Sequence, residues 1–291
     1  MNELLKLDKV SKKYPKFYLN NVSFSIKKGQ IVGFIGRNGA GKTTTLKGIM
    51  NLVHFDSGTV YAFGKNMRDT ELEAKQKIGF ALSEINYYPN ATIKRLTDVT
   101  KKFYKNFDQD KFDKLCKLFK LETNKKLEEL SSGMKVKYSL AIALSHDAEL
   151  LILDEPTSGL DPISRDEILD IFLSLVKDKE RAILFSTHIT SDLDKCASDI
   201  AYIHEGEIKY DGTKKDFINA YFLVKGDTNE FSEELKEKFI SFKEYPDHLE
   251  GLIEAKDKDY FLKNNVEVKA PDLEEIMIYL ERKDRHEDFT L

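Results

Sequence analysis

One stretch of the sequence decides the fold, namely Gly36-Arg37-Asn38-Gly39-Ala40-Gly41-Lys42-Thr43, which continues into Thr44. It fits the pattern G-x-x-x-x-G-K-[ST], and it follows a nearly continuous apolar segment and precedes a helical pattern, as the motif requires. Glycines in such a loop adopt backbone angles that other residues avoid, so successive amides can converge on phosphate oxygens at a helix N-terminus. We therefore predict that residues 36–44 hold a nucleotide, that Lys42 reaches its β- and γ-phosphates, and that Thr43 ligates Mg²⁺.

A second segment, residues 149–155, ends an apolar run with the carboxylates of Asp154 and Glu155. At the carboxyl edge of an open α/β sheet, these charges would lie where such sheets bind ligands. Because Mg²⁺ keeps several waters and takes only one or two carboxylates, we expect Asp154 to orient the metal. Glu155 is then available as the general base that activates water for attack on the γ-phosphate. The alternative for the pair is a structural role at a strand end, as a cap or in salt bridges.

The hydrophobic pattern predicts two kinds of strand. Residues 5–10 and 18–26 alternate apolar and polar positions, which is typical of an antiparallel sheet with one buried face. Residues 30–36, 149–154 and 181–186 are almost entirely apolar and are flanked by helical patterns, which indicates parallel strands covered on both faces. The predicted fold is therefore α/β, a P-loop NTPase with an N-terminal antiparallel β subdomain and a parallel-sheet core.

The chain is predicted to form two domains. Residues 92–145 carry apolar positions at helical spacing and are expected to be a helical subdomain inserted into a first domain, residues 1–221. Residues 222–291 are rich in Lys and Glu and contain short strand-like pieces and one amphipathic helix. We expect them to form a small C-terminal α/β accessory region without chemistry of its own.

The composition excludes several classes of protein. The 46 Lys and Arg residues are mixed with 50 Asp and Glu residues, so the net charge of −4 argues against a dedicated nucleic-acid binder. No segment approaches the run of about 18 apolar residues that a membrane-spanning helix needs, and charges interrupt the leucines near the N-terminus, unlike a secretory signal. The two cysteines, Cys116 and Cys196, lie among apolar residues in helical patterns and are predicted to be packed thiols.

Taken in order over residues 3–215, these motifs resemble those of the ATP-binding subunits of ABC transporters. The signature of that family is usually Leu-Ser-Gly-Gly-Gln, and Leu130-Ser131-Ser132-Gly133-Met134 stands at the corresponding place. The resemblance implies that Ser131, Ser132, Gly133 and Met134 face the phosphates of ATP, although Ser replaces a Gly and Met replaces the Gln. Without the resemblance, such a segment is more often an ordinary loop and helix cap.

Three further residues take their predicted roles from this resemblance. Asp161, in Ser158-Gly159-Leu160-Asp161, matches the D-loop, which meets the opposite subunit, and His188 matches the switch histidine that hydrogen-bonds the γ-phosphate. Tyr14 matches the aromatic residue that stacks on adenine, with Phe17 and Tyr18 as alternatives. A histidine or a tyrosine at a strand end is otherwise usually structural.

One family residue is absent. A gapless alignment puts Ser83, with Glu84 beside it, where the family has its Q-loop glutamine, which approaches Mg²⁺ and links the nucleotide to the membrane partner. Ser83 is the candidate metal ligand, but a hydroxyl does not reproduce a neutral amide, and this puts rapid hydrolysis in doubt. The nearby run Tyr87-Tyr88-Pro89 is either a docking surface for the permease or ordinary packing.

The resemblance implies an ATPase that binds ATP and Mg²⁺ and sandwiches two nucleotides in a head-to-tail dimer, either a homodimer or a heterodimer. It also implies an integral-membrane permease as partner, a peripheral location on the cytoplasmic side of the membrane, and no nucleic-acid partner. The signature form and the C-terminal region resemble ABC-2 type exporters, most closely those of the bacitracin and lantibiotic type. The alternatives are a soluble ABC ATPase not coupled to transport, or a hydrolytically weak ATP-dependent clamp.

Overall fold

The structure, a computed structural model, describes residues 2–82, 88–264 and 266–282. The chain divides into two compact units, Met1–Asp211 and Gly212–Leu291. The division therefore falls before the helix α8 (Lys214–Asn219), whereas the sequence pattern placed it after residue 221. The reason is that α8 packs with the second unit, where Phe217 contacts Tyr221 edge to face with ring centroids 5.6 Å apart.

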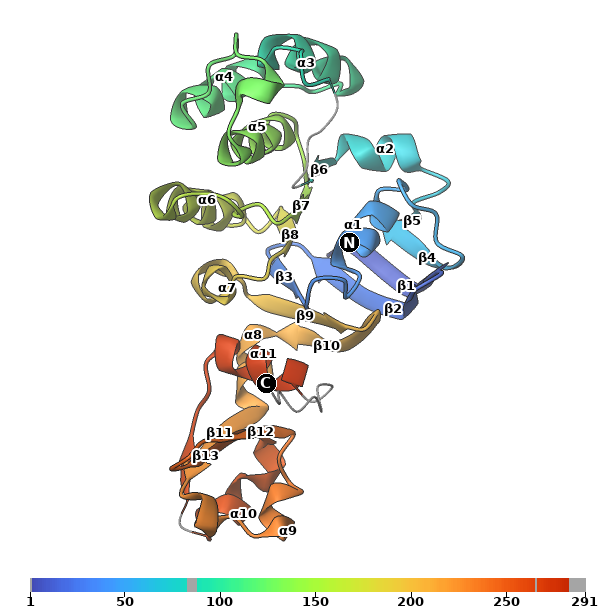
Figure 1. Cartoon of the computed structure of the whole chain (residues 1–291). Coiled ribbons are helices and arrows are strands. Elements are labelled where there is room, and N and C mark those ends of the chain that lie inside the picture. The colour runs from blue at the N-terminus through green and yellow to red at the C-terminus, as the bar shows by residue number, and fades with distance from the viewer. Residues whose placement is uncertain (1, 83–87, 265, 283–291) are drawn as a thin grey trace. The chain divides into compact units, whose positions relative to one another are not determined.

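The first unit begins with an antiparallel sheet in the strand order β2-β1-β4-β5 (Figure 1). Its strands are β1 (Glu3–Tyr14), β2 (Phe17–Lys27), β4 (Ser57–Ala62) and β5 (Lys65–Asn66). In β2, Phe24 and Ile26 are buried while Ser23 and Lys27 are exposed. The alternation in the sequence thus corresponds to one buried face, and the predicted antiparallel subdomain is confirmed.

A six-stranded sheet forms the centre of the first unit, in the order β10-β9-β3-β8-β7-β6. Its strands are β3 (Ile31–Ile35), β6 (Ile78–Ala81), β7 (Leu150–Asp154), β8 (Ala182–Ser186), β9 (Asp199–His204) and β10 (Glu207–Thr213). Strand β3 pairs in parallel with β8 and β9, and β7 pairs in parallel with β8 and β6. Every residue of β3, β7 and β8 is buried, as their continuous apolar sequences predict. The carboxyl ends of these adjacent strands therefore meet at one edge of the sheet.

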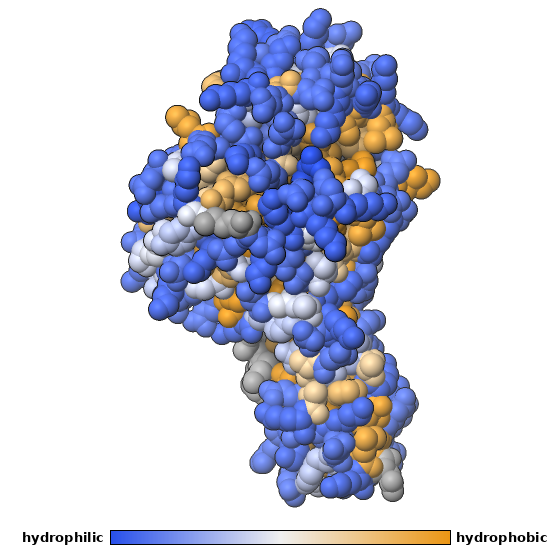
Figure 2. Space-filling model, turned by 180° about the vertical axis from the view of Figure 1, so that it is seen from behind, coloured by the Kyte–Doolittle hydropathy of each residue, from blue (hydrophilic) through white to orange (hydrophobic). Residues whose placement is uncertain are grey.

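Helices connect the parallel strands, as the predicted α/β alternation requires. Helix α1 (Lys42–Ile49) follows β3, α6 (Pro162–Leu175) follows β7, and α7 (Thr190–Cys196) follows β8, while α2 (Glu71–Gln76) precedes β6. Both cysteines are buried thiols, and burial raises the pKa of the Cys116 thiol to about 11. None of the helices in the described part of the chain combines the length and the apolar composition that a membrane span requires. Hydrophilic side chains cover most of the face drawn in Figure 2.

The helical insert lies between β6 and β7. It contains α3 (Ile93–Thr100), α4 (Gln109–Leu118) and α5 (Ser132–Leu144), with short 3₁₀ turns at Lys101–Phe103 and Leu127–Glu129. Figure 1 shows these three helices gathered at one end of the unit. Each begins at a side-chain cap, because Thr92, Asp108 and Ser131 accept a hydrogen bond from the backbone NH three residues ahead.

The second unit is a split βαβ fold with an added C-terminal helix. Its antiparallel sheet has the order β12-β13-β11-β14. After α8 the elements are β11 (Tyr221–Gly226), α9 (Glu233–Lys236), β12 (Ser241–Glu244), β13 (Leu249–Glu254), α10 (Lys258–Leu262), β14 (Glu267–Lys269) and α11 (Leu273–Arg282), with 3₁₀ turns at Thr228–Glu230 and Ala255–Asp257. Buried side chains from the sheet and from α9 and α10, such as Val224, Ile253 and Phe261, form a core separate from that of the first unit.

The core of the first unit gives a direct stability test. Phe185 of β8 is fully buried and packs against Phe172 of α6, with ring centroids 5.8 Å apart. We expect Phe185→Ala to destabilise the first unit by about 3–5 kcal/mol, because truncation of a buried aromatic side chain leaves a cavity. Urea unfolding followed by fluorescence and circular dichroism measures the loss.

A matched control for this variant is Leu72→Ala, since Leu72 is 84% exposed on α2. Its effect should stay within about 0.5 kcal/mol of zero. Equal effects of the two substitutions would contradict the assignment of Phe185 to the core.

Candidate functional site

The candidate site lies at the sheet edge where β3, β8 and β7 end. The loop 36–41 follows β3, Asp154 ends β7 with Glu155 directly after it, and His188 lies just beyond the end of β8. In the register of the parallel strands β7 and β8, Asp154 lies opposite Ser186. Three segments that are far apart in the sequence thus deliver their polar side chains to one edge.

Close packing explains why glycines are needed in the loop. A Cβ atom at Gly36 would lie 2.2 Å from the carbonyl oxygen of Ile203 in β9, and Gly41 has φ 110°, a left-handed conformation. Gly41 is also the N-cap of α1 and provides no side chain to cap the helix. The first amides of α1 are therefore available to an anion, and the positive end of the helix favours a phosphate there.

Lys42 lies inside this loop rather than on the surface. It is only 6% exposed, and its Nζ donates hydrogen bonds to the carbonyl oxygens of Gly36 (2.6 Å) and Arg37 (3.2 Å). The neighbouring loop residues Arg37, Asn38 and Gly39 are exposed, as is Thr43, whereas Ala40 is buried and Thr44 half-buried. The ammonium group of Lys42 is thus buried within the loop, while the residues at the edge of the loop are exposed to solvent.

Two oxygen donors suited to a divalent cation lie side by side. The hydroxyl of Thr43 donates to Asp154 Oδ2 at 3.0 Å, and the hydroxyl of Ser186 donates to Asp154 Oδ1 at 2.6 Å. Among the described residues there is no cluster of three or more His, Cys, Asp or Glu side chains that could hold a metal. One carboxylate and one hydroxyl suit Mg²⁺, which is usually bound by few protein ligands together with waters and substrate phosphates. Thr43 and Asp154 are the residues that would hold it.

Glu155 and His188 form the second polar pair of the site. The carboxylate Oε2 of Glu155 lies 2.8 Å from His188 Nδ1. Glu155 has φ 51°, an uncommon conformation for a residue other than glycine, and its NH donates to the hydroxyl of Ser186. Burial raises the pKa of Glu155 above the ordinary value, while His188 and Lys42 oppose this rise. A carboxylate of raised pKa beside a phosphate-binding loop is suited to accept a proton.

The signature and D-loop residues form a separate cluster. Ser131 caps α5 by accepting from Met134 N (3.2 Å), and Asp161 caps α6 by accepting from Ile163 N (3.1 Å) and Ser164 N (3.0 Å). Hydrogen bonds from Ser164 lower the pKa of Asp161. Ser131, Gly133, Met134 and Asp161 line one groove of about 420 Å³, and within the described residues no part of the loop 36–44 lines it. The structure therefore brings the predicted residues together in two groups.

Of the remaining predicted residues, the structure describes the aromatic side chains near the loop but not the candidates for the Q-loop position. Tyr14 is the last residue of β1, and the centroid of its ring lies 6.5 Å from the centroid of the Phe17 ring. A Cβ atom added at Gly41 would lie 2.8 Å from Cζ of Phe17. Phe17 therefore lies against the glycine loop, with Tyr14 beside it. Ser83, Glu84 and Tyr87 fall outside the described residues, as does the side chain of Ser132.

Several residues that hold the site in place were missed in the sequence. Asp192 of α7 is 1% exposed and accepts from the hydroxyl of Thr157 and from Arg165 Nε. It thereby joins the loop after Glu155 to the helix that follows His188. Ser186 could have been found from the register of two buried strands, whereas Asp192 is one of many acidic residues and has no local signal.

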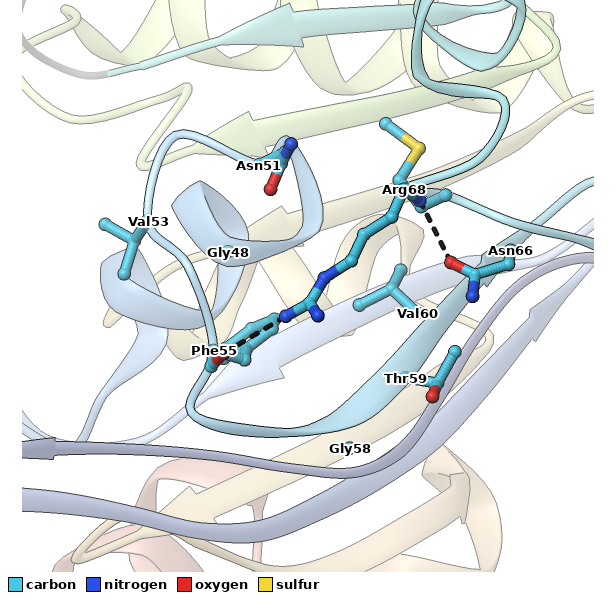
Figure 3. A pocket seen from close by; sticks show the side chains of 10 residues that line it. Gly48, Asn51, Val53, Phe55, Gly58, Thr59, Val60, Asn66 and Arg68 are labelled. Carbon is cyan, nitrogen blue, oxygen red and sulfur yellow. Dashed lines mark hydrogen bonds between the residues drawn. The ribbon is translucent and has the colours of Figure 1, made fainter.

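A small cavity of about 50 Å³ lies beyond the C-terminal end of α1, away from the glycine loop (Figure 3). Figure 3 shows the Arg68 side chain crossing it, where the guanidinium donates to the carbonyl oxygen of Phe55 at 3.1 Å. The cavity has room for a few water molecules but not for a nucleotide.

The fold and the loop at its sheet edge define a P-loop NTPase, with a helical insert between the phosphate loop and the carboxylate strand. Residues 19–158 match the family described as ABC transporter. The chain is 31% identical to the bacitracin transport ATP-binding protein BcrA of Bacillus licheniformis, over 92% of each protein. It belongs to the ATP-binding subunits of the ABC transporter family and is an ATPase.

Two further comparisons support this membership. The chain is 33% identical to the choline transport ATP-binding protein OpuBA of Bacillus subtilis, over 81% of this chain and 64% of that protein. The solved structure of an ATP-binding subunit of an ABC transporter superposes with a TM-score of 0.66 at 27% identity, over 73% of this chain and 91% of the other.

The buried cation of the loop gives the most direct test of nucleotide binding. Lys42→Ala should weaken the binding of ATP by about tenfold to a hundredfold, because hydrogen bonds from a charged group to phosphate are lost. Titration with a fluorescent ATP analogue measures the affinity. Lys47→Ala, a lysine substitution on the same helix, is the control and should bind as the parent does; equal affinities of all three proteins would contradict the site.

Proposed function

We propose that this chain is the ATP-hydrolysing subunit of an exporter, driving a separate membrane permease through ATP-dependent dimerisation. The observation that carries the proposal is the division of the site into two groups. The group around Lys42, Thr43 and Asp154 can bind a nucleotide but leaves its open side uncovered, and a separate groove with Ser131 and Gly133 offers the N-terminus of a helix.

The two groups complement each other in a head-to-tail pair. In our proposal, ATP and Mg²⁺ bind at the loop 36–44 of one subunit, and the signature segment 131–134 of the second subunit covers the γ-phosphate. The positive end of α5 then adds to the stabilisation of the phosphate charge. Glu155 polarises the attacking water, and His188 holds the γ-phosphate near it.

Hydrolysis in this arrangement would open the pair again. Loss of the γ-phosphate removes the group that both subunits contact, so the interface weakens and the subunits separate. A permease that follows this motion would transport its substrate. The pair can consist of two copies of this chain, because the chain contains both halves of a site.

An apolar groove on the helical insert supports a membrane partner. The groove has a volume of about 580 Å³, lies at the start of the insert, and is lined by Tyr88 (71% exposed) and Val99 (52% exposed) together with Pro89 and Leu96. It directly follows the segment where the family has its link to the permease. We propose that a cytoplasmic segment of the permease binds here, with Tyr88 as part of the docking surface.

The similarity to BcrA supports export of a peptide or a drug. The chain spans 92% of BcrA, a bacitracin transport protein, but 64% of OpuBA, a choline transport protein. The match to BcrA thus extends into the second unit, whereas the match to OpuBA leaves about a third of that protein uncovered. An amphipathic peptide antibiotic is therefore the proposed type of cargo, and the cytoplasmic face of the membrane is the proposed location.

The raised pKa of Glu155 gives a pH prediction. As a base, Glu155 acts only when it is deprotonated, so kcat/KM for ATP should fall as the pH drops through a pKa above 4.5, the ordinary value for a glutamate. Assays of ATP hydrolysis between pH 4.5 and 8 measure this acidic limb. Glu155→Gln should retain ATP binding, lower hydrolysis by about 10² to 10⁴, and lack the limb. A limb of the same midpoint in both proteins would contradict the role of Glu155.

The transporter proposal is tested by the partner. The tagged subunit, purified from solubilised membranes of its own host, should retain a polytopic membrane protein, and bacitracin should stimulate ATP hydrolysis after reconstitution in liposomes. Val99→Glu should greatly reduce retention, because it places a charge in the apolar groove, whereas Leu72→Glu on exposed α2 should not. Retention of no membrane protein would favour a soluble ABC ATPase, and absence of hydrolysis in the intact complex would favour a weak clamp.

A further inference from the structure

The signature segment and the D-loop approach each other closely at Gly133. A Cβ atom at Gly133 would lie 3.0 Å from the carbonyl oxygen of Gly159 and 3.2 Å from Cδ2 of Leu160. A side chain at position 133 would therefore push the two loops apart. This contact joins the start of α5 to the turn that precedes α6.

A lysine one helical turn further along α5 makes a second contact. Lys137 Nζ donates to the hydroxyl of Ser164 on α6 at 2.6 Å, and Ser164 is buried. The backbone NH of Ser164 in turn donates to Asp161, the cap of the same helix. Lys137, Ser164 and Asp161 thus form one chain of hydrogen bonds from the signature helix to the D-loop.

A groove of about 420 Å³ leaves much of the space between the first turns of α5 and α6 open. The contacts that do join the two helices there are therefore important for their relative position. Lys137, Ser164, Gly133 and Gly159 all line this groove. A charged donor to a buried hydroxyl is the strongest of the contacts described, and its loss leaves a buried polar group without that donor.

We propose that Lys137 is a positioning residue that, through Ser164, holds the signature segment and the D-loop of one subunit together as a single docking surface for the nucleotide-loaded second subunit. The inference rests on the proposed dimer. It differs from the roles of Lys42 and Glu155 because Lys137 acts on the partner's nucleotide and not on the nucleotide of its own loop. Loss of the link should therefore weaken dimerisation and leave the binding of ATP by the single subunit unchanged.

The test uses the full chain with Glu155→Gln, which slows hydrolysis and preserves the ATP-bound dimer. Sedimentation equilibrium with Mg-ATP measures the dimer Kd, and a fluorescent ATP analogue at low protein concentration measures binding to the single subunit. Lys137→Met, which keeps the aliphatic stem, should weaken dimerisation by at least about tenfold, equivalent to 1.4 kcal/mol. Its affinity for ATP as a single subunit should stay within about twofold of the parent, which also shows that the variant is folded.

Two further variants separate positioning from general damage. Ser164→Ala should cause a similar loss, and the double variant should be no worse than either single variant, because both remove the same hydrogen bond. Lys137→Arg should retain most of the dimerisation, and Lys114→Met, at an exposed lysine of α4, is the matched control.

The outcomes distinguish this inference from the proposal on which it rests. Normal dimerisation of Lys137→Met, or additive losses in the double variant, would overturn the role of Lys137 while the proposed dimer stands. Failure of the parent Glu155→Gln protein to dimerise with Mg-ATP would overturn the proposed function and this inference together.

Discussion

The carboxylate of Asp154 is the interaction on which the site depends. It accepts hydrogen bonds from Thr43 at the start of α1 and from Ser186 at the end of β8, and it is itself the last residue of β7. One buried acid thus fixes the phosphate loop relative to two central strands. Because Ser186 also accepts from the NH of Glu155, the same contact places the proposed base. The residues proposed for binding and those proposed for hydrolysis therefore share one hydrogen-bonded anchor.

The phosphate loop and the central strands could be predicted because their signals are local. The glycine spacing from Gly36 to Thr43 follows from the backbone geometry of the loop. The three strands that are buried on both faces have almost continuously apolar sequences, which are easily recognised. Asp154 and Glu155 could be placed for the same reason, since they end one of those strands. These features depend on residues that are neighbours in the chain.

Other features could not be predicted because they depend on tertiary approach. Asp192 and Arg165 meet only after α6 and α7 have packed, and Lys137 finds Ser164 across a groove between two helices. The split βαβ fold of the second unit could also not be predicted from the sequence. Its strands are short, and β12 has no buried residue, so the alternation that predicts strands is missing there.

The left-handed backbone at Glu155 has a consequence for how this protein can evolve. Glycine would occupy that conformation without strain, and relief of the strain is worth about 1 kcal/mol, although glycine would also lose the contact of the carboxylate with His188. The backbone conformation and the proposed role of Glu155 as a base therefore favour different residues at this position. On that proposal, relatives that no longer need ATP turnover should carry glycine or asparagine here more often than active ones do.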